Sequence, residues 1–111
     1  MKRDLLHKSL ELSTEIHQLI RELPEEKQTE TTEQVKTLSL TVQSHLVRGQ
    51  KQDPEELKNS LELAKNSLSE LETQLLDTVK QRSLKKMTIN PVLAQMGILD
   101  AEIDGLMKTI R

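Results

Sequence analysis

The chain has 111 residues, a mass of 12.7 kDa, and no cysteine or aromatic residue. Its length predicts a single domain over residues 1–111. Without cysteine, the chain has no disulfide, thiol nucleophile or thiolate metal site, and without aromatic rings it has no base-stacking platform for single-stranded nucleic acid. A formal net charge of −2 gives the whole chain no general attraction for nucleic acid.

The composition favours an all-α protein. Leucine supplies 20 of the 38 apolar residues, and β-branched Val and Ile together supply only 11. Three glycines and three prolines are too few for the many turns of an all-β fold. No apolar run approaches the roughly 18 residues of a transmembrane helix, and the N-terminal segment lacks the apolar stretch of a signal peptide. We therefore expect a cytoplasmic protein without membrane contact.

The first predicted helix covers residues 4–23. Its apolar stripe recurs at alternating spacings of 4 and 3 through Leu5, Ser9, Leu12, Ile16, Leu19 and Leu23. Leu6, Leu10 and Ile20 widen this stripe, which favours a bundle helix over a two-stranded coiled coil. Pro24 disfavours helical geometry at Leu23 and suits the first turn of the next helix.

The second predicted helix covers residues 25–48. Residues 25–34 contain no large apolar side chain, so we expect the first turns to be solvated or weakly held. The stripe begins late, with Val35, Leu38, Val42 and Leu46. Gly49 fits a C-terminal cap with a positive φ.

The third predicted helix covers residues 54–82 and carries the strongest start signal. Asp53 is the expected N-cap, Pro54 fills the first helical position and Glu56 lies three residues after the cap. The apolar stripe comprises Leu57, Leu61, Ala64, Leu68, Leu71, Leu75 and Val79.

The fourth predicted helix covers residues 91–110 and starts at Asn90-Pro91, again a cap followed by proline. Its stripe comprises Val92, Met96, Leu99, Ile103, Leu106 and Ile110. Gly97 and Gly105 lie nearly on one helical face. They are either tolerated weak points or sites where a neighbouring backbone approaches closely.

Together the segments predict an antiparallel, up-and-down four-helix bundle. A long parallel coiled coil is the rival architecture, but the breakers and the shifts of stripe between segments count against it. The predicted core consists of Leu12, Ile16, Leu19, Val35, Leu38, Val42, Leu61, Leu68, Leu71, Leu75, Leu99, Ile103 and Leu106.

Two stretches between Leu23 and Thr78 carry a family resemblance. The first comprises Leu23-Pro24-Glu25-Glu26, Gln34-Val35, Leu38-Ser39-Leu40 and His45-Leu46-Val47-Arg48-Gly49; the second runs from Leu61 to Leu75 and includes Glu70-Leu71-Glu72-Thr73-Gln74-Leu75. They resemble the bacterial proteins encoded within intervening sequences of 23S ribosomal RNA genes. The chain departs from that pattern in having His45 for Asn, Arg48 for Glu, and no aromatic residues.

The resemblance implies an up-and-down four-helix bundle that often assembles as a ring-shaped homopentamer. It implies no established enzymatic activity. The accessory variability determinant of diversity-generating retroelements is similar in fold, partners a reverse transcriptase and presents a basic surface to nucleic acid.

The residues offer no catalytic or metal-binding pattern, so we expect neither a catalytic residue, a metal nor a cofactor. His7, His17 and His45 are the only histidines, and the Asp4-to-His7 spacing that suits a metal lies at a fraying end. Glu70 and Glu72 flank Leu71 and are expected to face solvent. Phosphate-binding loops and nucleophile elbows are also missing, which argues against an enzyme.

The charge distribution singles out residues 78–90. This segment holds Lys80, Arg82, Lys85 and Lys86 with no acidic residue, a local charge of +4 that we call the basic collar. The four cations are either ordinary helix-terminal charges that favour the helix dipole or a rim that contacts phosphates of RNA or DNA. In an antiparallel bundle the collar lies at the same end as the connection between the first two helices.

Surplus apolar positions outside the main stripes, including Leu63 and Leu76, predict self-association.

These observations lead to two hypotheses about function. The first is a homo-oligomeric, non-enzymatic scaffold or adaptor, with a pentamer expected, that docks a protein partner. The second is a nucleic-acid-binding accessory protein that uses the basic collar beside a reverse transcriptase.

Overall fold

A computed structural model describes residues 3–50 and 53–110. Its elements, in chain order, are α1 (Arg3–Arg21), the short 3₁₀ helix η1 (Glu25–Lys27), α2 (Glu30–Gly49), α3 (Pro54–Lys80) and α4 (Lys86–Thr109). The described residues contain no strand. The all-α prediction is therefore confirmed.

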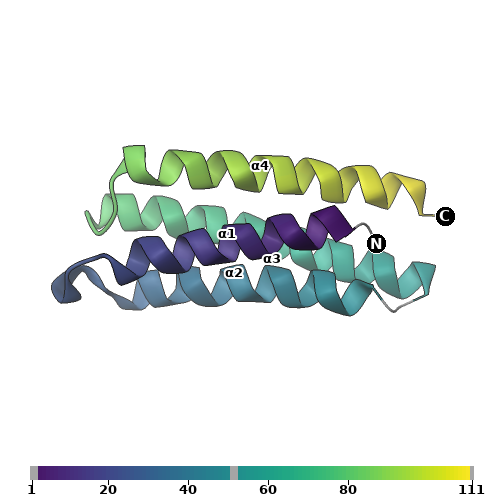
Figure 1. Ribbon diagram of the computed structural model, residues 1–111, viewed down its shortest axis with the longest axis horizontal. Helices are drawn as coiled ribbons and strands as arrows, with labels where there is room; N and C mark the ends of the chain where they lie inside the picture. Colours follow the sequence, from purple (N-terminus) through teal and green to yellow (C-terminus); the bar gives the residue numbers. More distant parts are fainter. Residues whose placement is uncertain (1–2, 51–52, 111) are drawn as a thin grey trace.

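The four α-helices form an elongated up-and-down bundle of 47 × 20 × 19 Å (Figure 1). Each helix packs against the next one in the chain, and α4 closes the bundle against α1. Between the described parts of α1 and α3, or of α2 and α4, the backbones make no close contact, so these pairs are diagonal. This arrangement confirms the antiparallel bundle and excludes the long parallel coiled coil.

One cluster of aliphatic side chains fills the centre. It comprises Leu5, Leu12, Ile16, Ile20, Val35, Val42, Leu46, Leu61, Ala64, Leu68, Leu71, Leu75, Leu84, Ile89, Val92, Met96, Leu99 and Ile103. Of the residues expected in the core, Leu19, Leu38 and Leu106 are only partly buried and pack against this cluster, and the other ten belong to it.

The start of α2 lies five residues later than predicted. Residues 25–27 form the exposed turn η1, and Thr29 becomes the N-cap of α2. The backbone N–H of Thr32 donates to the Thr29 hydroxyl at 3.3 Å, and the Thr29 N–H donates to the Thr32 hydroxyl at 2.8 Å. This reciprocal cap fixes the helix start, whereas residues 25–28 bury no side chain that could hold an earlier turn. α1 correspondingly ends at Arg21 rather than at residue 23.

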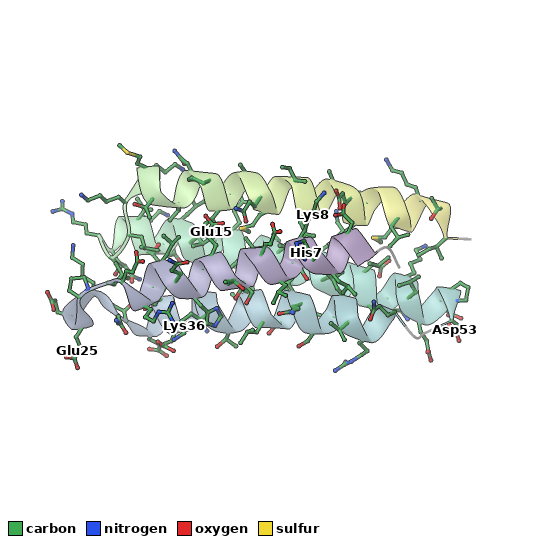
Figure 2. The ribbon with its side chains drawn as sticks, in the orientation of Figure 1. His7, Lys8, Glu15, Glu25, Lys36 and Asp53 are labelled. Carbon is green, nitrogen blue, oxygen red and sulfur yellow. The ribbon has the colours of Figure 1, made fainter. Side chains whose placement is uncertain are left out.

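The other end of α2 also differs from expectation. Gly49 lies inside the helix, Gln50 is the C-cap, and no described glycine has a positive φ. The predicted start of α3 is confirmed, because the Asp53 carboxylate accepts the backbone N–H of Glu56 at 2.9 Å and Pro54 follows the cap (Figure 2).

α4 begins at Lys86, five residues before the predicted start, and Pro91 lies inside the helix. The added turn buries Ile89 completely. Proline removes one helical hydrogen bond, that to the carbonyl of Met87 four residues earlier. Met87 and Pro91 are both exposed, so water can take the place of the missing donor.

Gly97 and Gly105 do not mark a close backbone approach within the chain. A Cβ atom added to either glycine has no neighbour within 4 Å, and both residues face solvent. The interpretation as a close helix contact inside the bundle is wrong, and the glycines are open positions on the surface of α4.

Candidate functional site

The basic collar surrounds the corner where α3 turns into α4. Lys80 ends α3, Arg82 lies in the turn, Lys85 is the N-cap of α4 and Lys86 is its first residue. The corner lies at the same end of the bundle as the turn between α1 and α2 (Figure 1). The structure thus brings all four predicted cations to one end, although α3 ends at Lys80 and not at residue 82.

Arg82 occupies an unfavourable backbone conformation. Its φ is 62°, and it is the one non-glycine residue with a positive φ in the described chain. The backbone N–H of Arg82 donates to Val79 O at 3.0 Å, and that of Ser83 donates to Thr78 O at 2.9 Å. This is the Schellman pattern of a helix C-terminus, in which glycine usually occupies the left-handed position. An arginine there costs stability that glycine does not.

The helix dipole accounts for Lys80 alone among the collar residues that lie in or cap a helix. Lys80 lies in the last turn of α3, where a cation is favourable. Lys85 and Lys86 lie at the N-terminus of α4, where the dipole is positive and disfavours further cations. That turn contains no acidic residue and no side-chain cap. Two lysines therefore add to the positive potential of the helix end.

A hollow of about 640 Å³ connects the collar with the α1–η1 turn. Arg82, Lys85 and Lys86 line one wall, and Lys27 and Glu22 lie on the other. Lys27 is separated from the collar by more than 50 residues in sequence, so the charge count over residues 78–90 could not include it. Among the side chains that line the hollow, the cations outnumber the acids.

A second surface is the outer face of α4, of which the sequence pattern indicated only Gly97 and Gly105. Its exposed residues between the flanking lysines are Met87, Asn90, Pro91, Ala94, Gly97, Ile98, Ala101 and Gly105. None of them is charged. Met87 is 82 % exposed and Ile98 is 54 % exposed. A solvated helix face normally carries charged side chains, so this face resembles a contact surface.

The acidic residues of α4 lie at the sides of the helix, where they form ion pairs with the neighbouring helices α1 and α3. Lys65 on α3 contacts Asp100 at 3.1 Å and Asp104 at 2.5 Å. Lys8 on α1 pairs with Glu102 and, at 3.3 Å, with Asp4 (Figure 2). These hydrogen bonds, above all to Asp104 and Glu102, raise the pKa of Lys65 and of Lys8. The carboxylates are thereby held at the flanks and leave the outer face uncharged.

A third surface is the side of the bundle formed by α1 and α2. Leu10 and Leu40 are each 48 % exposed and line the same groove of about 320 Å³ between the two helices. Val47, also half-exposed, follows Leu40 by two helical turns and lies on the same face of α2. Of the other predicted surplus positions, Leu63 is exposed on α3 and Leu76 packs partly against the core.

The three histidines lie apart and have different surroundings. His7 Nε2 contacts the Glu11 carboxylate at 2.7 Å on the surface, and His17 Nδ1 lies 2.8 Å from Ser13 O. His45 Nδ1 is buried and has no hydrogen-bond partner. Burial, together with the charge of Arg48, lowers the pKa of His45.

The carboxylates likewise form no recognisable site. Within residues 3–50 and 53–110, no group of three or more His, Cys, Asp or Glu side chains is arranged to hold a metal ion. Glu70 and Glu72 are exposed, as their positions beside Leu71 predict. In the same residues, no helix is both long and apolar enough to span a membrane.

The described residues thus form an antiparallel four-helix bundle whose candidate sites lie on its surface. A protein-family model described as "23S rRNA-intervening sequence protein" matches residues 1–105. The chain belongs to this family, and the match covers all of α1, α4 as far as residue 105, and the two stretches that carry the resemblance. A search of curated proteins finds no match.

Proposed function

We propose that this protein is a non-enzymatic, self-assembling scaffold or adaptor that docks a protein partner. The observation that carries the proposal is the uncharged, exposed outer face of α4. Exposed apolar surface is costly in water, and contiguous patches of it commonly mark protein contacts. This face lies outside the core cluster, so we expect another chain to cover it.

The expected assembly is a ring of five chains, as the family resemblance implies. In such a ring each copy repeats the same surfaces, so a weakly binding site gains avidity from multiplicity. Size-exclusion chromatography with light scattering tests the proposal directly. A mass near five chains supports the homopentamer, and another multiple supports a scaffold of different size. A mass of one chain contradicts self-assembly.

A second candidate function is a nucleic-acid-binding accessory protein that partners a reverse transcriptase. Arg82 favours it specifically, because a cation is kept at a position where glycine costs less. Lys85 and Lys86 support it, since they extend the positive end of α4 toward the hollow that Lys27 also lines. Without aromatic residues, binding would rest on contacts to phosphates and weaken steeply with salt.

The double variant Lys85→Glu, Lys86→Glu tests this candidate. The matched control is Arg48→Glu, Lys58→Glu, which makes the same change of net charge with exposed residues outside the collar. We expect the collar variant, and not the control, to lose retention of RNA or duplex DNA at low salt. Each lost phosphate contact makes the negative slope of log affinity against log salt less steep by about 0.9 on duplex DNA. Equal retention by both variants contradicts the collar as the binding site.

A further inference from the structure

We propose that the outer face of α4 in one copy docks against the α1–α2 side of the next copy, head to tail. This inference rests on the proposed self-assembly and names its two contact surfaces. Both surfaces belong to the same chain but lie on different parts of the bundle, because α4 packs on α1 and α3 and not on α2.

The shapes of the two surfaces are complementary. The outer face of α4 is a convex helix surface with Met87 and Ile98 as its large side chains. The α1–α2 side has a groove of about 320 Å³ with Leu10 and Leu40 on its two walls. A helix laid along such a groove touches two helices of its neighbour, which buries more apolar surface than a single helix-to-helix contact.

The charges of the two surfaces are also complementary. The exposed charged residues on α4 are Lys86 and Lys108, one near each end of the uncharged stretch. Of the charged side chains around the groove, Glu11 and Glu15 line the adjoining hollow beside Leu10, and Arg21 lines the groove itself. The lysines of one copy thus meet a side with an excess of negative charge on the next.

A contact between the outer α4 faces of two copies accounts for fewer of the exposed apolar residues than the head-to-tail contact does. It brings the exposed lysines of two identical faces together and leaves Leu10, Leu40 and Val47 in water. Head-to-tail contact covers those three residues as well as Met87 and Ile98. A contact between two different surfaces leaves one free surface at each end of a pair, so further copies can add, and a ring forms when the rotation between copies closes.

Two variants and a control test this arrangement. Ala101→Glu places a charge in the middle of the outer face of α4, and Leu40→Glu places one in the groove. Asn59→Glu is the control, because Asn59 is an exposed, uncharged residue of α3 and lies outside both surfaces. We expect the first two variants to elute as single chains and the control to keep the wild-type mass. Far-UV circular dichroism with a thermal melt checks that each variant folds, and Ala94→Glu replaces Ala101→Glu if that variant does not.

Mixing the two disrupted variants gives the sharper result. The Ala101→Glu chain keeps an intact groove and the Leu40→Glu chain keeps an intact α4 face, so one productive contact remains between them. We expect a complex of two chains, one of each variant, and no larger species. If Leu40→Glu behaves like the control, or the mixture stays monomeric, the head-to-tail contact is wrong while self-assembly stands. A wild-type mass of one chain overturns both the contact and the proposed scaffold.

Discussion

Arg82 combines an unfavourable backbone conformation with one of the positive charges of the basic collar. Its left-handed φ of 62° closes the C-terminus of α3, and its guanidinium belongs to the basic collar. Arg82→Gly relieves the backbone penalty, so we expect the free energy of unfolding to rise by about 1 kcal/mol. Arg82→Ala removes the same charge without that relief. Chemical denaturation distinguishes the two variants, and a gain for alanine equal to that for glycine would contradict the conformational explanation.

His45 predicts how stability depends on pH. Its pKa in the folded protein lies below the ordinary value of 6.5, because burial and Arg48 disfavour the charged ring. The unfolded chain therefore binds a proton more readily than the folded chain, and acidification favours unfolding. We expect stability to fall as the pH drops from 6.5 toward the folded pKa, and to level off below it. His45→Gln removes this contribution, so its thermal midpoint should change less over that range. Identical pH profiles for both proteins would contradict the prediction.

Single residues also explain what the sequence could predict of the candidate surfaces. The four collar cations are contiguous enough in sequence to be recognised as one group. Lys27 joins their hollow only through the fold. The outer face of α4 was not predicted as a surface because the acids within residues 100–104 indicate a solvated segment. The ion pairs with Lys65 and Lys8 show that these carboxylates lie at the sides of α4.

At the scale of the helices, the caps set the boundaries. The start of α3 was predictable because Asp53 and Pro54 act locally. The start of α2 was not predictable from the sequence. The usual capping box pairs a Ser or Thr at the N-cap with a Glu or Gln three residues later, whereas here Thr29 pairs with Thr32. The start of α4 was misplaced because tertiary burial of Ile89 outweighs the cost of Pro91 inside the helix.

The contribution of the Thr29 cap to the free energy of unfolding can be measured. Thr29→Ala removes the hydroxyl that accepts the Thr32 N–H, so we expect a loss of about 1 kcal/mol in the free energy of unfolding. Thr31→Ala is the control, because Thr31 lies in the same first turn outside the cap. Denaturant titration followed by circular dichroism gives both values. Equal losses would show that the cap does not fix the start of α2.

At the scale of the whole molecule, the aliphatic core holds the bundle together. The helical period alone placed its main stripes, because the residues of the buried face, most of them apolar, recur at spacings of 3 and 4 in all four helices. The period could not show that Leu19, Leu38 and Leu106 lie at the margin of the core, since that depends on how neighbouring helices cross.

Leu71 provides the direct test of this core. Its side chain is fully buried, and Leu71→Asp places an unpaired carboxylate where no water can reach it. We expect the variant to be unfolded or nearly so at room temperature, because the cost is comparable with the whole stability of a small domain. Leu63→Asp on the exposed side of α3 should retain a cooperative melt. Full helical circular dichroism for Leu71→Asp would contradict the core assignment.

The up-and-down order gives the molecule a polarity. α1 begins and α4 ends at the end of the bundle that lies opposite the collar (Figure 1). In a closed ring of identically oriented copies, every collar would therefore line one rim, and every chain end would emerge at the other. Such a ring has two chemically different faces. A protein fused to either end of the chain would be displayed away from the basic rim, so it should not obstruct a polyanion bound there.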